Sequence, residues 1–248
     1  MEFMNGRTVD SYLWMRELVE PSYDTKEQLD PYALIFVLNG TKNSDGEYAS
    51  EAEVFQAAVN GMLDVFADPE PSNRNNLMNW LDGRIRKLVK RVKPSGWEAL
   101  LSEPTLHHVG SASMASVAVF TPIQVSRQPE RVRKAQMSGL DISNREPSRP
   151  TVPYLKIDVD EQLHMTTGKL VAQICHGAQL FLMKSSQAEV TTWLKNGSVI
   201  QVNRVQQLPP ITEKTVVIRD AGFTEIPAGS VTVTAEFIST SDKETYET

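Results

Sequence analysis

The chain is poor in cysteine. Cys175 is the single cysteine among 248 residues, which excludes an internal disulfide and any metal site built from several cysteines. No apolar run approaches the roughly 18 residues that a membrane span needs, and the N-terminus lacks a basic start followed by an apolar segment. We therefore expect a cytoplasmic protein with no membrane partner.

Positive charge is also in deficit, because the formal net charge is −6. An acidic chain is not a general binder of polyanions, so any nucleic acid would have to bind a local basic patch. We expect no DNA partner. The apolar and charged fractions, 40% and 23%, are those of an ordinary globular protein, and 248 residues can bury one large core or two smaller ones.

The most informative stretch runs from Tyr154 to Leu182 and predicts a strand, a short polar loop and a helix. Its first apolar residues alternate, as they do along a strand, at Leu155, Ile157 and Val159. After Gly168 the apolar residues recur at helical spacing instead.

The polar residues of this predicted helix share one face, at Lys169, Gln173 and His176. A helix N-terminus combined with a lysine and two hydrogen-bonding side chains suits an anionic ligand. A solvated helix face explains the same pattern without any ligand.

A second motif begins at Lys214 with the sequence KTVVIRDAGFTEIPAGSVTVTAEF. It predicts two strands joined by turns at Ala221-Gly222 and around Pro227-Ala228-Gly229. Asp220 stands at the end of the first strand, where it could orient or deprotonate a water molecule. Its alternative role is that of a turn residue whose carboxylate accepts hydrogen bonds from nearby backbone amides.

Four segments are expected from composition and periodicity. They are a helical extension over 1–30, an N-terminal α/β domain over 31–142, a linker over 143–153 and a C-terminal α/β domain over 154–240. The linker is predicted from its proline and polar residues, SNREPSRPTVP.

Within the N-terminal domain we expect a buried strand at 32–38, a helix begun by a capping box of Ser50 and Glu53, and a second helix over 73–93. The end of that second helix is predicted to carry six positive charges, at Arg84, Arg86, Lys87, Lys90, Arg91 and Lys93. This basic helix is the best candidate for RNA binding in an acidic chain. Cations favoured by a helix C-terminus are the structural alternative.

Four smaller predictions complete the survey. His107 and His108 stand between a proline and a glycine-serine loop, and we expect no metal there because no Asp, Glu or Cys lies beside them at ligand spacing. A strand over 116–125 contains Pro122, which indicates an edge position or a bulge. A short helix over 187–195 and a strand over 198–205 follow.

Together the two motifs form a paired signature, GKxxAQxxHxA followed by VxxDAGxTEIxxGSxTV. The pair resembles the archaeal/eukaryotic-type peptidyl-tRNA hydrolases over roughly residues 151 to 238. The resemblance implies an α/β fold with a mixed β-sheet flanked by helices, peptidyl-tRNA as the partner, no metal and no cofactor. It also implies a homodimer, or an internal pseudo-dimer made by the two halves of this chain.

The resemblance also assigns roles at matching positions. Asp220 would orient or deprotonate the attacking water, Thr224 would hold the aspartate or the substrate, and Lys169 would stabilise the oxyanion or a phosphate of the terminal nucleotides. The residues implied to line the substrate site are Gln173, His176, Gly168 and Gly222. If the site is active, Lys169, Asp220 and Thr224 should lie within about 8 Å of one another around one open cleft.

This chain departs from the family pattern in three places. The loop that is usually KMGKGK reads HMTTGK over 164–169, so His164 and Thr167 replace lysines. Phe223 stands where a polar residue is usual, and the segment 205–215 is too short for the helix that usually precedes the second motif. We expect the N-terminal half to cover the face of the sheet that this helix would leave open.

Three functions follow as hypotheses. The first is an esterase that hydrolyses peptidyl-tRNA, the second a non-catalytic relative that binds tRNA through the basic helix, and the third a protein-interaction module. Because the N-terminal half repeats the order strand, loop, helix, helix, strand, a further hypothesis makes residues 31–142 a degraded copy of the C-terminal half. An unrelated sheet topology would contradict it.

Overall fold

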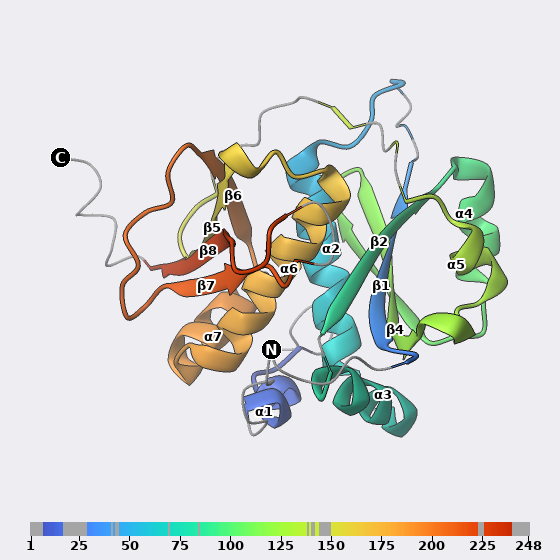
Figure 1. Cartoon of the computed structure of the whole chain (residues 1–248), viewed down its shortest axis with the longest axis horizontal. Coiled ribbons are helices and arrows are strands. Elements are labelled where there is room, and N and C mark those ends of the chain that lie inside the picture. Colours follow the sequence, from blue (N-terminus) through green and yellow to red (C-terminus); the bar gives the residue numbers. More distant parts are fainter. Residues whose placement is uncertain are drawn as a thin grey trace. The chain divides into compact units, whose positions relative to one another are not determined.

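The computed structural model describes residues 7–16, 29–40, 42, 45–68, 70–83, 85–137, 139, 142–143, 150–222 and 226–239 (Figure 1). These residues form two compact units, each built around one sheet. The C-terminal unit also contains α1 (Asp10–Arg16), and the N-terminal unit also contains Thr167–Ala172. Most of the expected linker, 143–153, lies outside the described residues, and the expected segment bounds stay a prediction.

Four strands form the sheet of the N-terminal unit: β1 (Tyr32–Asn39), β2 (Arg86–Val92), β3 (His107–Ala112) and β4 (Ala115–Gln124). Their order is β2-β1-β4-β3, with β1 parallel to β2 and the other two pairs antiparallel. The register of β1 and β4 shifts where Ala33 faces Ile123 but Ile35 faces Phe120. The shift spans Pro122, so the expected bulge is confirmed, although β4 is an inner strand.

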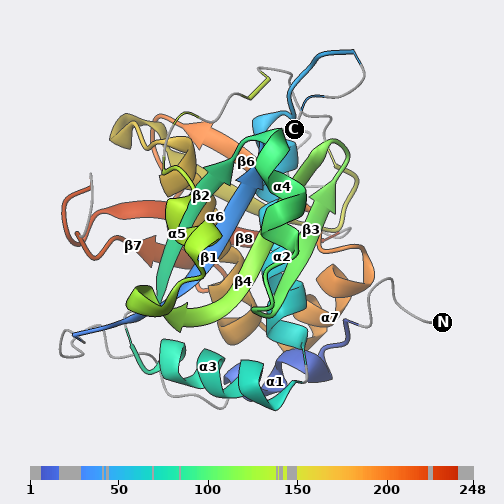
Figure 2. The same ribbon diagram turned by 90° about the vertical axis from the view of Figure 1, so that its right-hand side faces the viewer.

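Helices lie on both faces of this sheet, as Figure 2 shows with α4 and α5 in front and α2 behind. The helix α2 (Glu51–Ala67) begins at the expected capping box of Ser50 and Glu53. On the opposite face, α4 (Pro94–Leu101) and α5 (Glu130–Lys134) pack on the strands. The buried residues of the core between the sheet and these two helices are Ala33, Ile35, Val37, Trp97, Leu100, Ala118, Phe120 and Val132. Because both faces are covered, β1 is buried almost throughout.

The predicted helix over 73–93 is wrong in its second half. The helix α3 (Pro71–Leu81) ends at Asp82, and the chain then forms the edge strand β2. The turn at Asp82-Gly83 and the positive φ of Ile85, 38°, interrupt the helix. Pairing with the buried strand β1 overrides the helical spacing of the leucine and isoleucine residues, which local propensity could not reveal.

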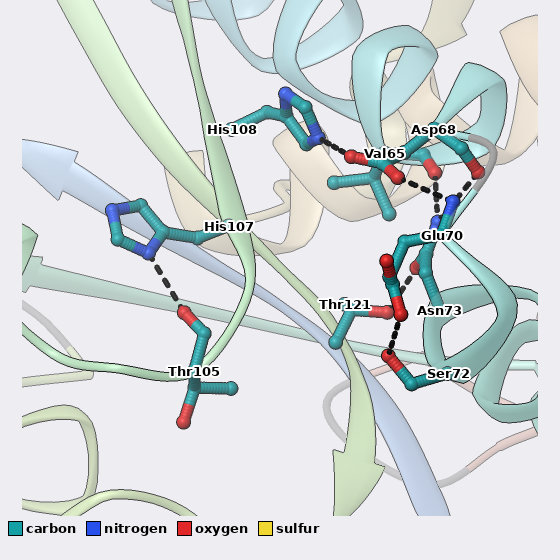
Figure 3. Close-up of polar contacts among 9 residues, drawn as sticks. All are labelled: Val65, Asp68, Glu70, Ser72, Asn73, Thr105, His107, His108 and Thr121. Atoms are coloured by element: carbon teal, nitrogen blue, oxygen red, sulfur yellow. Dashed lines mark hydrogen bonds and ion pairs between the residues drawn. The ribbon is translucent and has the colours of Figure 1, made fainter.

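The two histidines, His107 and His108, lie next to each other in β3. Neighbouring strand residues point to opposite faces, and Figure 3 shows this separation. His108 Nε2 lies 2.6 Å from Asp68 Oδ2, whereas His107 Nδ1 lies 2.9 Å from the carbonyl oxygen of Thr105. The buried Asn73 donates to the Val65 carbonyl at 2.7 Å on the same side as Asp68. The His108–Asp68 contact ties β3 to the end of α2, and the Asn73–Val65 contact ties α3 to the same helix.

The C-terminal unit contains β5 (Tyr154–Asp160), β6 (Ile200–Val205), β7 (Val216–Arg219) and β8 (Val231–Ile238). Their order is β6-β5-β8-β7, with β5 parallel to β6 and the other pairs antiparallel. The helix α6 (Thr167–Lys184) packs one face, where Phe181 stacks on Phe237 at 5.9 Å between ring centroids. The predicted helix α7 (Gln187–Lys195) follows with the predicted bounds. Two four-stranded mixed sheets flanked by helices confirm the expected fold class.

The face of the C-terminal sheet opposite α6 is polar. Lys156 Nζ lies 3.3 Å from Asp158 Oδ2 and 4.0 Å from Glu236 Oε2, and Asn203 donates to Asp158 Oδ1 at 2.8 Å. The segment 206–215 forms turns and extended backbone rather than a helix, as the sequence predicted. In the N-terminal unit, α4 occupies this position in the chain. That the N-terminal unit covers the polar face stays a prediction.

Candidate functional site

Asp220 is the centre of the candidate site. It follows β7 directly and is 6% exposed. Its Oδ1 accepts a hydrogen bond from the Gly222 amide at 2.8 Å, and its backbone pairs with Ser230 and Gly229 at 2.9 and 2.7 Å. The turn therefore fixes the carboxylate by short-range contacts, as the structural alternative anticipated. That role leaves the second carboxylate oxygen to be explained.

Gln173 contacts that second oxygen from α6. Its Nε2 donates to Asp220 Oδ2 at 2.8 Å, and the side chain is buried at 4% exposure. The structure thus brings together two residues that are 47 positions apart, one from each motif. A hydrogen bond from a buried amide to a carboxylate is stronger than one between neutral groups, so this contact holds the acid in one orientation.

Thr232 extends the chain of contacts, and the sequence survey did not single it out. Its hydroxyl donates to Gln173 Oε1 at 2.8 Å and is also 3.4 Å from the Ile218 carbonyl oxygen. The signal that could have identified it is its place in the second motif, in GSxTV. Because an ionised carboxylate can only accept, the amide nitrogen of Gln173 must face Asp220, and the amide oxygen is then left to accept from Thr232. All three side chains are buried, so the orientation is fixed at every link.

Such a carboxylate suits general base chemistry. An ionised carboxylate has about four acceptor positions, and the two donors described occupy one on each oxygen. A base of this kind can orient a water molecule or take its proton once substrate is present. The glycine after it is required by the turn, because Gly222 has φ of 79° and an added Cβ would lie 2.7 Å from the Cβ of Ala228.

The other predicted site residues are placed less closely. Lys169 and Gly168 lie in the first turn of α6, in the part that groups with the N-terminal unit. Lys169 precedes Gln173 by one helical turn, and His176 follows it by nearly one; both are half-buried. Thr224 and Phe223 lie outside the described residues. The expected grouping of Lys169, Asp220 and Thr224 around one cleft therefore stays a prediction.

The loop before α6 contains a short 3-10 turn and a left-handed residue. The 3-10 turn η3 (Glu161–Leu163) ends at His164, which adopts a left-handed conformation with φ of 44°. Met165 after it is buried at 7% exposure. The loop thus offers one lysine, Lys169, as a cation for phosphate.

The basic residues once assigned to a helix are distributed over a strand. Alternation along β2 places Lys87 and Arg91 on one face and Arg86 and Lys90 on the other. Lys90 is 8% exposed and donates to Gln128 Oε1 and to the Val132 carbonyl, each at 2.8 Å. Burial lowers the pKa of the Lys90 ammonium. The basic helix is therefore wrong as a structure, and no single positive stripe replaces it.

Two positions complete that set. Arg84 lies outside the described residues, and Lys93 is exposed just after β2, where it precedes α4. Lys87 Nζ stands 4.9 Å from the ring centroid of Trp80, a cation–π contact. Binding of RNA by these residues stays a prediction.

Two searches of the described part of the chain gave negative results. Among those residues there is no group of three or more His, Cys, Asp or Glu placed to hold a metal ion. None of their helices is both long and apolar enough to cross a bilayer.

Comparison with known proteins places the same segment in one family. The model of the family described as Peptidyl-tRNA hydrolase PTH2 matches residues 155–239. A "Peptidyl-tRNA hydrolase" of Methanothermobacter thermautotrophicus is 31% identical over 86 residues, which cover 31% of this chain and 77% of that protein. Another, from Methanococcus maripaludis strain C6, is 36% identical over 89 residues with the same coverage. No solved structure matches the chain at a significant level.

Proposed function

Since this chain belongs to the PTH2 family of peptidyl-tRNA hydrolases through its C-terminal unit, we propose that it hydrolyses the ester that joins a peptide to tRNA. The observation that carries the proposal is the buried chain from Thr232 through Gln173 to Asp220. This chain of hydrogen bonds links the two motifs of the family signature and fixes the Asp220 carboxylate just after β7. The products would be a free peptide and tRNA.

We assign the attacking water to Asp220. The ester carbon needs a nucleophile at neutral pH, and a positioned carboxylate can accept the proton as the water attacks. Gln173 and Thr232 act through Asp220 and are positioning residues, because their contacts run to the acid and to each other. A fixed acceptor avoids reorganisation during the reaction, which is the usual source of electrostatic catalysis.

We assign to Lys169 the stabilisation of negative charge on the substrate. Attack on the ester develops an oxyanion, and the terminal nucleotides of tRNA carry phosphates. A cation near a helix N-terminus, where the helix dipole is positive, favours either anion. Thr224, four residues after Asp220, is assigned to the substrate or to the acid, and His176 to the wall of the site.

The non-catalytic alternatives have less support. A relative that binds tRNA without cleaving it would depend on the basic residues of β2, but these point to two faces and Lys90 is buried in hydrogen bonds. A protein-interaction module would not need a buried glutamine aligned on a buried aspartate. The retained Gln173–Asp220 contact therefore favours the enzyme.

A matched pair of aspartates tests the proposal. Asp220 and Asp160 each accept a hydrogen bond from the amide two residues ahead, at 2.8 and 3.0 Å, but Asp160 caps η3 and is half-buried. We expect Asp220→Asn to lower kcat for N-blocked aminoacyl-tRNA by about 100-fold or more, because a neutral amide cannot accept the proton. Asp160→Asn should stay within about twofold. Equal losses in the two variants would contradict the assignment.

A further inference from the structure

The two units share one topology. In each, a strand is followed by a long helix, a shorter helix and a strand parallel to the first, and then by two antiparallel strands. The sheet orders β2-β1-β4-β3 and β6-β5-β8-β7 correspond strand for strand, with the same parallel and antiparallel pairs. Topology alone can recur by chance, so details that the topology does not require are more informative.

The first such detail is a tryptophan in the second helix. Trp80 Nε1 donates to the carbonyl of Arg86, and Trp193 Nε1 donates to the carbonyl of Val199. Both hydrogen bonds are 2.8 Å long, both span six residues and both reach the start of the parallel strand. Each indole is at most 1% exposed, and each contacts a phenylalanine of the preceding long helix, although Phe66 and Phe181 do not stand at equivalent positions.

Two backbone details agree with this one. Five residues after each tryptophan stands a non-glycine residue with positive φ, Ile85 at 38° and Ser198 at 56°, and such residues are uncommon. The long helices also match, since Gly61 of α2 packs on Val119 of β4 and Gly177 of α6 packs on two residues of β8. The glycines set the alignment of the two helices.

Counting from these glycines shows what has happened to the site. The positions of Lys169, Gln173 and His176, at eight, four and one before Gly177, correspond in the N-terminal unit to Glu53, Ala57 and Asn60. The lysine is replaced by a residue of opposite charge, and the glutamine by a side chain that cannot form hydrogen bonds. Each change removes a group assigned above to the reaction or to the positioning of the acid.

The acid is missing as well. Counted from the tryptophan-bonded carbonyls of Arg86 and Val199, the strand registers make Val119 equivalent to Ala235, and Val117 therefore equivalent to Val233. Gly110 faces Val117 and Ile218 faces Val233, so Asp220, two residues after Ile218, corresponds to Ala112. The long turn after Asp220 is also absent, because β3 and β4 are joined by two residues only.

The N-terminus of α2 is capped by a carboxylate of the same helix, that of Glu53. Glu53 Oε2 accepts hydrogen bonds from the Ser50 amide and hydroxyl, at 2.7 and 3.0 Å. A carboxylate held at the N-terminus of α2 uses the positive end of the helix dipole and repels a second anion.

We infer that the N-terminal unit is a second copy of the hydrolase fold whose site has been erased, so that the full chain carries one site for peptidyl-tRNA. The nature of the site rests on the proposed function, whereas the equivalence of the two units rests on the structural details alone. The copy retains the tryptophan, the glycine and the strand order, which maintain the fold. It lacks the acid, the glutamine and the lysine, which are assigned above to the reaction and to the positioning of the acid.

The test is a titration of the full chain with a tRNA analogue in which an amide replaces the ester, so that it binds without being cleaved. We expect one analogue per chain. Lys169→Ala should raise Kd at least tenfold, while the matched variant Glu53→Ala should leave Kd within twofold. Two analogues per chain, or an equal loss of affinity in both variants, would overturn the inference.

Absence of binding would refute the proposed function, and the copy then has a separate test. Indole N–H exchange, measured by NMR and assigned with Trp80→Phe and Trp193→Phe, should be slow for both residues. Fast exchange at either Trp80 or Trp193 would show that the shared hydrogen bond is not present in both units.

Discussion

Replacing Gln173 with leucine should destabilise the C-terminal unit, because it removes two hydrogen bonds and leaves the buried Asp220 and Thr232 without this partner. The contact with Asp220 involves a charge and is worth about 1.5–3 kcal/mol, and the contact with Thr232 about 0.5–1.5 kcal/mol. Leucine fills nearly the same volume, so a cavity adds little. We expect the free energy of unfolding to fall by about 2–4 kcal/mol.

Thr232→Val supplies the second arm of a double-mutant cycle. Alone it should cost about 1 kcal/mol, because it removes one neutral donor and keeps the shape of the side chain. Combined with Gln173→Leu it should cost about 1 kcal/mol less than the sum, since the partner is already gone. The assay is urea unfolding of the folded variants, followed by circular dichroism. Costs below about 0.5 kcal/mol, or strict additivity, would refute the buried chain of hydrogen bonds.

Three further predictions concern packing and pH. Gly61→Ala should lower the free energy of unfolding by about 1–3 kcal/mol, measured by heat or urea, because the added Cβ would lie 2.7 Å from Val119 Cγ2. Gly177→Ala should be neutral or stabilising, because its Cβ would lie 3.5 Å or more from the side chains of β8. Asp68→Ala should cost about 1–2 kcal/mol, since it removes the acceptor of His108 at 2.6 Å, and a change below about 0.3 kcal/mol would contradict this. Hydrogen bonds from the side chain and then the amide of Ser126 lower the pKa of Asp30. This carboxylate therefore stabilises the fold above its unfolded pKa of about 3.8, and the effect is lost as pH falls through the lower folded pKa. Ser126→Ala should lower the melting temperature near pH 6 and by less near pH 3.

Local signals in the sequence predicted local structure well. The capping box of Ser50 and Glu53 begins α2 as expected, and the strand, loop and helix from Tyr154 to Leu182 are confirmed. These features depend on contacts between residues a few positions apart, such as the Ser50–Glu53 pair at 2.7 Å. Neighbouring residues in the sequence contain that information.

Contacts between distant segments account for the errors. The segment 86–92 has helical spacing of its apolar residues, but pairing with β1 makes it a strand. Thr232 was missed although it stands in the second motif, because its partner, Gln173, lies 59 positions away and the motif does not show that the two residues touch. Gln173 and Asp220 could each be proposed separately, and only the fold shows that they touch.

The equivalence of the two halves was visible only as a shared order of elements. Their side chains match poorly, so the sequence could not separate duplication from chance. The tryptophan hydrogen bonds and the sheet orders provide the details that the sequence lacked. Selection for the fold keeps such contacts, while residues of a lost site are free to change.

The most direct test of the account is turnover of N-blocked aminoacyl-tRNA by the purified full chain, beside folded Lys169→Ala and Gln173→Leu variants. The account predicts release of free tRNA by the parent protein, and losses of about 100-fold with Lys169→Ala and about 10-fold or more with Gln173→Leu. A parent protein that binds the substrate but releases no tRNA would contradict it, and would leave the signature as a feature of the fold alone.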